Sequence, residues 1–271
     1  MRRFLSLALV VPLLTSCSSL WGNKKEVKRP TQPPVAEEVK KPSPEEKAKG
    51  YYQIGVAYLQ MGEIPLALNY LLKARKLSPK DPKIYNAIGF AFLKRGDYKR
   101  AESYLKKALS LKKDFSEAWL NLGILYEEKG DLKRAEECYL KALENPLYLT
   151  PEAAYYRLAL LELKKGNREK AKRNLIMAIR NNQDFAPAYI ELAKLLEDEG
   201  KLEEAKDIYF RLISLYPKLQ EPYCRLGELF IKSGDTLNGK KYLKKCISID
   251  PTSSLAAKAR RRLVELDGQA P

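Results

Sequence analysis

The chain has 271 residues, of which 45% are hydrophobic and 10% aromatic, and its 50 Lys and Arg against 34 Asp and Glu give a net charge of +16. This composition excludes a disordered or fibrous chain, and the complete lack of histidine removes the commonest general base and metal ligand. An excess of positive charge suits nucleic acid, anionic lipid head groups or an acidic protein face, whereas lysines dispersed over solvated helix faces explain it without any partner. No nucleic-acid-binding motif accompanies the charge.

The amino terminus has the features of a processing signal. Arg2 and Arg3 precede an apolar run over residues 4–14, which is too short to span a bilayer and is typical of a signal peptide. The next residues, Leu-Thr-Ser-Cys at 14–17, resemble the bacterial lipobox, in which small residues precede a cysteine that receives the lipid. The resemblance implies cleavage before Cys17 and lipidation of its thiol, and the serine that follows resembles the residue of lipoproteins exported to the outer membrane. The alternative is an ordinary secreted protein with an incidental cysteine.

Residues 17–47 combine five prolines with lysine and glutamate and show no helical or strand period. This composition predicts a disordered tether with an end-to-end distance of roughly 30 Å, which would hold a folded domain off the membrane.

From residue 48 onward the sequence repeats itself. Gly55, Gly89 and Gly123 are spaced by 34 residues, and aromatic, leucine and alanine residues recur around them. This period and pattern resemble the tetratricopeptide repeat (TPR), a helix-turn-helix unit, and predict an all-α superhelical solenoid of six repeats with a capping helix. We expect these glycines to lie where the two helices of a repeat cross closely. A second series is expected to end the first helix of each repeat in a left-handed conformation: Gly62, Gly96, Gly130, Gly166, Gly200 and Gly234.

The predicted organisation has four parts. They are a signal peptide at 1–16, the lipidated cysteine and tether at 17–47, repeats at 48–81, 82–115, 116–149, 152–185, 186–219 and 220–253, and a capping helix and tail at 254–271. The basic cluster at 258–262 suits a solvated cap, with an anionic lipid or acidic partner as the alternative. Two residues inserted within 145–151 interrupt the period after the third repeat, where we expect a local change in the superhelix.

The resemblance to TPR proteins implies that positions 5, 9 and 12 of each repeat face a concave groove. Repeats one to four then offer a largely apolar surface, which suits an amphipathic helix or an extended apolar peptide. The predicted protein-binding residues are Tyr52, Val56, Leu59, Phe90, Leu93, Leu120, Ile124, Tyr156, Leu160 and Leu163. The corresponding positions of repeats five and six include Lys194, Glu197, Cys224 and Glu228 and predict a charged groove. The alternative is that neighbouring repeats bury these side chains.

Cys138, Cys224 and Cys246 form no C-x-x-C pair, which argues against a zinc site. Cys246 occupies the packing-alanine position of repeat six and Cys224 is expected to face the groove. An oxidising compartment would permit a disulfide, but the sequence assigns none.

The lipobox, the proline-rich tether, six repeats and Asn145-Pro146-Leu147-Tyr148 after the third repeat occur together. This layout is similar to that of the type IV pilus biogenesis and stability lipoproteins, the pilotins of the pilus secretin. The resemblance implies a lipid-anchored outer-membrane protein, facing the periplasm, that helps a secretin subunit reach the membrane and oligomerise. The alternative is a general envelope adaptor for barrel assembly or for recruiting cell-wall enzymes. No nucleophile–base pair, phosphate loop or metal cluster supports an enzyme, and we expect no cofactor, metal, nucleic acid or small-molecule substrate.

Overall fold

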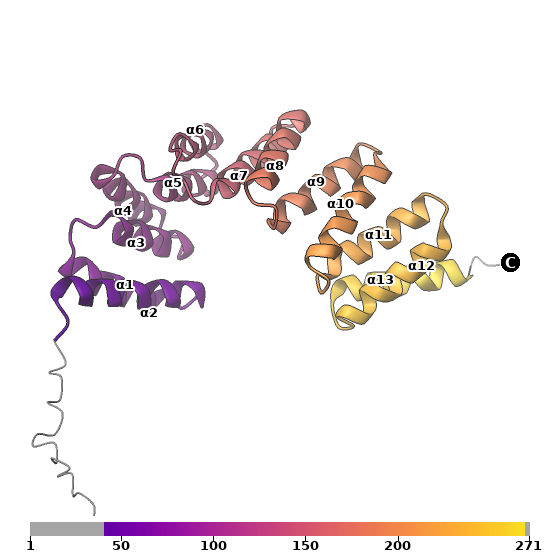
Figure 1. Cartoon of the computed structure of the whole chain (residues 1–271), viewed down its shortest axis with the longest axis horizontal. Coiled ribbons are helices and arrows are strands. Elements are labelled where there is room, and N and C mark those ends of the chain that lie inside the picture. Colours follow the sequence, from indigo (N-terminus) through magenta and orange to yellow (C-terminus); the bar gives the residue numbers. More distant parts are fainter. Residues whose placement is uncertain (1–40, 269–271) are drawn as a thin grey trace, which may run out of the picture. The chain divides into compact units, whose positions relative to one another are not determined.

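Antiparallel helix pairs follow one another in chain order (Figure 1). The computed structural model describes residues 41–268, and within this range it contains thirteen α-helices and no strand. The first helices of the six repeats, and then their second helices, have the following bounds: α1 Pro44–Gln60, α3 Pro82–Lys94, α5 Ser116–Glu128, α7 Pro151–Lys164, α9 Ala186–Asp198 and α11 Gln220–Lys232; α2 Ile64–Leu77, α4 Tyr98–Leu111, α6 Leu132–Leu143, α8 Arg168–Asn181, α10 Leu202–Leu215 and α12 Thr236–Ile249. The helix α13, Ser254–Gly268, follows the sixth pair. The expected all-α solenoid is confirmed.

The first helix begins earlier than the sequence predicts. The Ser43 hydroxyl accepts a hydrogen bond from the Glu46 amide at 3.1 Å, and the Glu46 carboxylate accepts one from the Ser43 amide at 2.7 Å. This reciprocal capping box satisfies two amides that the helix itself leaves unpaired. Residues 44–47, which the prediction assigned to a disordered tether, are therefore the first turn of α1. The part of the tether before residue 41 lies outside the described residues.

Glycine determines both the turns and the closest helix contacts. The six glycines between the helices of each pair have φ values from 73° to 87°, a left-handed conformation that side chains with a Cβ adopt at a cost. A Cβ on Gly123 would lie 2.5 Å from the ring of Tyr139, and one on Gly89 would lie 2.7 Å from Leu105. Both helices of a repeat can approach this closely only because the crossing residue has no side chain, as the sequence predicted.

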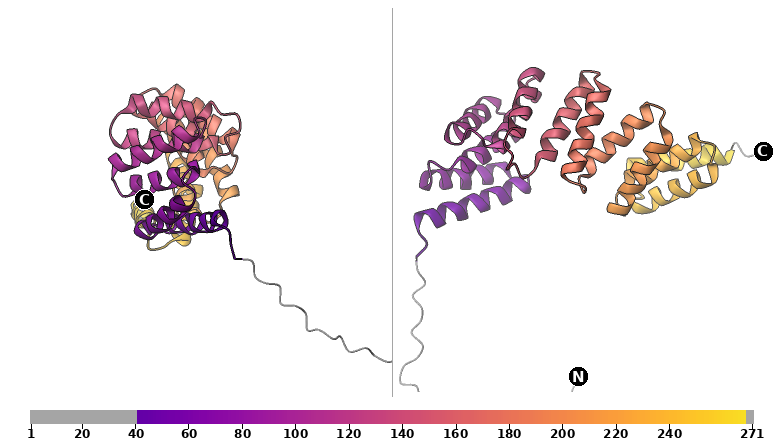
Figure 2. Two further views of the ribbon diagram at one scale, coloured as in Figure 1. Left: turned by 90° about the vertical axis from the view of Figure 1, so that its left-hand side faces the viewer. Right: turned by 45° about the horizontal axis from the view of Figure 1, so that its top comes forward.

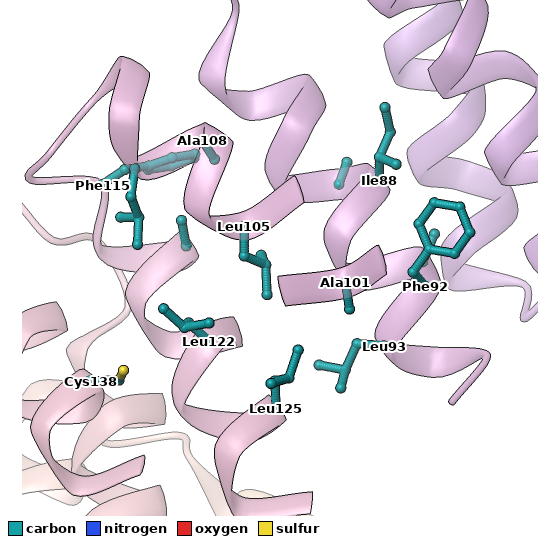
Figure 3. Close-up of a cluster of buried hydrophobic side chains, with 14 of the residues drawn as sticks. Ile88, Phe92, Leu93, Ala101, Leu105, Ala108, Phe115, Leu122, Leu125 and Cys138 are labelled. Atoms are coloured by element: carbon teal, nitrogen blue, oxygen red, sulfur yellow. The ribbon is translucent and has the colours of Figure 1, made fainter. Parts of the chain in front are cut away.

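The core follows the helix pairs as neighbouring clusters of buried side chains. One cluster extends from α2 to α7, a second from α7 to α11, and a third joins α11, α12 and α13. Figure 3 shows part of the first cluster, with Leu105 of α4 and Leu122 and Leu125 of α5 among the buried side chains. Each such leucine contributes about 1.5–3 kcal/mol by leaving water. Every repeat thus buries part of its apolar surface by stacking on its neighbours, and Figure 2 shows the stacked helix pairs from two further directions.

The inserted residues after repeat three form an ordered connection. Tyr148 is buried between Ala142 of α6 and Ala154 of α7. The Asn145 side chain donates a hydrogen bond to the Asp114 carbonyl at 2.9 Å and accepts one from the amide of residue 147 at 2.9 Å. These contacts join the end of α6 to the preceding inter-repeat turn, so the insertion is anchored on both sides.

The C-terminal helix α13 covers the sixth repeat. Its Leu255, Ala259 and Leu263 pack on the last hydrophobic cluster, and Arg262 forms ion pairs with Glu228 and Glu265. Residues 42–271 form one compact unit, which contains all of the described clusters. None of the helices within residues 41–268 is long and apolar enough to cross a membrane.

Candidate protein-binding groove

The first helices of repeats one to three form a groove with a volume of about 510 Å³. The helices α1, α3 and α5 contact one another across neighbouring repeats, so their exposed sides form the inner face of the superhelix. Five predicted residues line the groove and remain half-buried: Tyr52, Val56, Leu59, Phe90 and Leu120. The structure therefore brings together half of the predicted apolar strip around the ring of Phe90.

Polar groups at set positions border the apolar floor. The Asn121 side chain donates a hydrogen bond to the side-chain oxygen Oδ1 of Asn86 at 2.9 Å, and Lys94 Nζ lies 5.4 Å from the centre of the Phe90 ring. Burial raises the pKa of Tyr52, and the nearby Asp81 and Glu117 carboxylates raise it further. The groove thus combines an apolar floor with hydrogen-bonding and charged groups, which is the usual composition of a surface that binds a peptide in one orientation.

Leu93 does not belong to this surface, which corrects the prediction for one residue. Its side chain is only 8% exposed, and Figure 3 shows it among buried residues near Ala101 and Leu125. A neighbouring repeat buries this side chain, which is the alternative that the sequence left open. The first helix of the following repeat, α5, packs over the end of α3 and covers Leu93. Ile124 is half-buried against the same cluster but does not line the groove.

The predicted residues of repeat four lie apart from the Phe90 groove. Tyr156 packs edge-on against Phe185 at 5.5 Å, and Leu163 belongs with it to the second hydrophobic cluster. Leu160 is half-buried and belongs to neither cluster. The structure does not bring these three side chains into the groove of repeats one to three.

A charged cluster lies at the junction between repeats three and four. Glu127 accepts a hydrogen bond from the Tyr139 hydroxyl at 2.7 Å and forms ion pairs with Lys164 and, at 3.8 Å, with Arg157. Burial acts to raise the pKa of Glu127, but the hydrogen bonds from Lys164 and Tyr139 outweigh it and lower the pKa. The carboxylate therefore stays charged and paired at a position that an apolar ligand would have to cross.

The same arrangement recurs two repeats later. The Tyr209 hydroxyl donates a hydrogen bond to Glu197 at 2.6 Å, and Arg225 of the following repeat lies 3.8 Å from that carboxylate. The other charges of this region are also paired within the chain: Lys194 with Glu191 and Glu221, and Glu228 with Arg262. The charged inner face of repeats five and six is therefore largely neutralised by its own residues.

Cys224 is a second correction, because it is buried and does not face the groove. It forms a disulfide with Cys246, with 5.1 Å between the two Cα atoms, while Cys138 is a buried free thiol. The sequence left this pair unassigned although a signal exists. The two cysteines stand ten residues before and twelve after Gly234, the turn of an antiparallel pair, and are therefore nearly level with each other.

Cys17, the predicted lipidation site, lies outside the described residues. Among residues 41–268 no group of three or more His, Cys, Asp or Glu is placed so that it could hold a metal ion.

Family models for the tetratricopeptide repeat match four stretches of the chain, 55–96, 92–145, 156–219 and 220–253. The gap between the second and third matches coincides with the insertion after repeat three. A curated relative, protein O-mannosyl-transferase TMTC3 of Homo sapiens, is 36% identical over 63 residues. That match covers 23% of this chain and 7% of the relative, so the chain spans a small part of the relative's length.

Solved structures share the fold at low sequence identity. PilF of Pseudomonas aeruginosa is 21% identical with a TM-score of 0.69, and the match covers 81% of this chain and 99% of PilF. PilW, described as a widely conserved type IV pilus biogenesis factor, is 21% identical with a TM-score of 0.66, covering 78% of this chain and 97% of PilW. YrrB, described as a TPR protein with an unusual peptide-binding site, is 22% identical with a TM-score of 0.53 over 70% of this chain and 97% of YrrB. The expected resemblance to pilus biogenesis proteins is confirmed at the level of the fold.

The paired helices, the two glycine series and the four family matches agree across residues 55–253. The chain is a protein-interaction scaffold of the tetratricopeptide-repeat family.

Proposed function

We propose that this protein is a lipid-anchored scaffold of the bacterial outer membrane that binds a secretin subunit in the Phe90 groove and assists its localisation and assembly. The observation that carries the proposal is the groove itself. It gathers five half-buried apolar side chains on the inner face of three repeats, beside polar groups that can orient a peptide. The fold shared with PilF and PilW, the latter described as a type IV pilus biogenesis factor, supports the choice of partner.

The disulfide supports a location outside the cytoplasm. Disulfides persist in oxidising compartments such as the bacterial periplasm and are rare where thioredoxin and glutathione keep thiols reduced. A Cys224–Cys246 bond therefore suits a periplasmic protein, in agreement with the lipobox at residues 14–17. The two observations are independent, since one comes from the last repeat and the other from the amino terminus.

The anchor has a direct test. The change Cys17→Ser should abolish incorporation of a radiolabelled fatty acid, because the thiol that accepts the lipid is gone. The control is Cys138→Ser, which alters a buried cysteine that is already free and should leave labelling intact. Label that persists in the Cys17→Ser protein would refute the anchor.

The groove is tested by changing its floor. Phe90→Glu and Leu120→Glu place a charge among apolar side chains, and each removes an anchor whose burial is worth about 1.5–3 kcal/mol. Each change should weaken binding of the secretin by roughly 10- to 100-fold. The matched changes Lys194→Ala and Glu228→Ala, in repeats five and six, remove surface ion pairs worth less than about 1 kcal/mol and should have little effect.

Both sets are compared in one pull-down with the secretin, with circular dichroism to confirm that helicity is unchanged. Greater damage from the repeat-five and repeat-six changes would place the binding site at the other end of the solenoid. If the unchanged chain captures no secretin but captures a different envelope protein, and the groove changes abolish that capture, the result would instead favour the general envelope adaptor.

A further inference from the structure

Positive charge is concentrated in two parts of the chain, residues 240–262 near its C-terminal end and a longer stretch in the first repeats, which lies nearer the proposed anchor. Residues 64–113 contain thirteen Lys and Arg but only three Asp and Glu, so these 50 residues carry +10 of the net charge of +16. This stretch runs from the beginning of α2 to the turn after α4. The excess is therefore not dispersed over all solvated helix faces, as the simplest interpretation of the composition would have it.

Part of the unpaired charge in this stretch lies on the second helices, and the rest lies on α3 and in the turns. The helix α2 contains three cations and no acidic residue, and α4 contains four cations and the single carboxylate of Glu102. That carboxylate pairs with Lys106, Asp97 pairs with Arg100, and Arg75 donates a hydrogen bond to the Tyr104 hydroxyl. Four exposed lysines of α2 and α4 have no carboxylate partner among residues 41–268, and we call them the outer set: Lys73, Lys76, Lys99 and Lys107.

The charge differs between the two sides of these repeats. The groove on the inner side is lined by one cation and one carboxylate, Lys94 and Glu117, and therefore carries no net charge. The helices α2 and α4 do not line the groove, whose residues come from α1, α3 and α5. A surface that attracts anions thus backs onto a groove that does not, and both can be occupied at once.

Two exposed leucines lie among these lysines. Leu66 and Leu77 of α2 are 42% and 38% exposed, and with Lys73 they share one side of the helix because they are seven and four residues from it. Leucines interspersed with lysines are typical of helices that lie on membrane interfaces, where the apolar groups enter the boundary region and the ammonium groups meet the phosphates. Exposed leucines would add nothing to a surface that binds nucleic acid through its phosphates.

We propose that the outer face of α2 and α4 rests on an anionic phospholipid bilayer. The choice of partner rests on the proposed membrane anchor, because the tether that the sequence predicts between Cys17 and Ser43 would span roughly 30 Å and keep this end of the solenoid near the lipid surface. The tether also raises the effective concentration of the bilayer, so a weak contact suffices. The solenoid then turns its groove away from the membrane, toward a partner in the periplasm.

The test uses residues 42–271, the compact unit that contains the described cores but not the anchor. Its binding is measured by cosedimentation with vesicles of phosphatidylcholine alone or with phosphatidylglycerol added. The protein should bind only the anionic vesicles and should be released by added salt, because a surface charge is screened within about 10 Å at 0.1 M. Failure of the anchor proposal cannot affect this result, since residues 1–41 are absent.

Two variants with equal loss of charge locate the contact. Changing the outer set to Gln should weaken binding by about 100-fold or more, because each lysine near an anionic membrane strengthens binding by roughly fivefold. The control set is also exposed, lies on second helices and has no carboxylate partner among the described residues: Lys170, Lys241, Lys244 and Lys245. Changing the control set to Gln should weaken binding by less than about 3-fold, since these lysines lie in repeats four and six.

Three results would overturn the proposal. They are an absence of binding to anionic vesicles, an equal loss in both variants, which would indicate net charge alone, and binding that is as strong to neutral vesicles. A single-stranded oligonucleotide serves as the alternative ligand. If it binds through the outer set while the vesicles do not, the surface recognises nucleic acid and the proposal fails. Thermal unfolding of both variants confirms that the folds remain comparable.

Discussion

The disulfide in repeat six should hold the C-terminal end of the solenoid together. Cys224 of α11 and Cys246 of α12 are 22 residues apart, and the bond closes a loop of this length. Closing such a loop removes chain entropy from the unfolded state, which corresponds to about 3 kcal/mol at 25 °C. Because each repeat contacts only its neighbours, we expect this stabilisation to be local to α11, α12 and α13.

Hydrogen exchange measures such a local effect. Reduction of residues 42–271 with dithiothreitol should accelerate amide exchange in α11 and α12 by about 100-fold, the equivalent of about 3 kcal/mol, while exchange in α3 and α4 stays unchanged. The double change Cys224→Ala with Cys246→Ala should exchange like the reduced protein with or without reductant. Alanine is a suitable replacement at position 246, because Ala74 and Ala108 occupy the same position in repeats one and two.

Thiol counting provides the control. The denatured, unreduced protein should present one reactive thiol, Cys138, and the reduced protein three. In the folded protein Cys138 should remain unreactive, because burial raises the pKa of its thiol to about 12. If reduction adds two thiols but leaves exchange in α11 and α12 unaltered, the bond does not stabilise the last repeat and the entropic argument is wrong.

Three further predictions concern stability, each measured by the unfolding of residues 42–271 or of the chain named. Gly123→Ala should destabilise the protein by about 1–3 kcal/mol, because the added Cβ would lie 2.5 Å from a buried tyrosine ring, whereas Gly50→Ala meets no atom within 4 Å and should not destabilise it. Hydrogen bonding from a lysine one turn along α4 lowers the pKa of Glu102 to about 2 from 4.5. The stability that this carboxylate contributes is complete above pH 4.5 and is lost as the pH falls through about 2. The free energies of unfolding of the wild type and of Glu102→Gln should therefore converge as the pH falls from 4.5 to about 2. A difference that stays constant over this range would contradict the prediction. Deleting residues 1–41 should leave the melting temperature unchanged, whereas deletion through residue 47 removes the capping box of α1 and should cost about 0.5–2 kcal/mol; equal effects would refute the role of the cap.

The helices could be predicted from the sequence because their requirements are local. A glycine is needed wherever φ is positive or a second helix passes within contact distance. Because each repeat meets both requirements at the same positions, the glycines recur at a regular spacing along the chain. Half of the predicted strip lines the groove, since position 5 of the first helix faces it in repeats one to three and position 9 faces it in repeats one and two.

What the sequence could not supply depends on contacts between repeats. Leu93 has the same position as Leu59, but only Leu93 is buried, because the stacking of α5 decides the outcome. To pair Cys224 with Cys246 one must know which residues of α11 and α12 lie beside each other, and the sequence alone left three cysteines to choose from. The start of α1 was missed because Ser43 lies in a proline-rich stretch whose composition obscures a capping signal.

Two carboxylates on first helices take their cations from the following repeat, so the ion pairs that a shortened array would lose depend on where it ends. Glu127 takes Lys164 and Arg157 from repeat four, and Glu197 takes Arg225 from repeat six. An array that stops after repeat three or repeat five would lose these ion pairs, and because the missing repeat also covers the carboxylate, Glu127 or Glu197 would then face water. An array that stops after repeat four loses Asp198 and Glu199 instead, and the cations they leave behind, on α8, simply face water. The junctions after repeats three and five therefore join neighbouring repeats by ion pairs in addition to the apolar stacking that every junction shares.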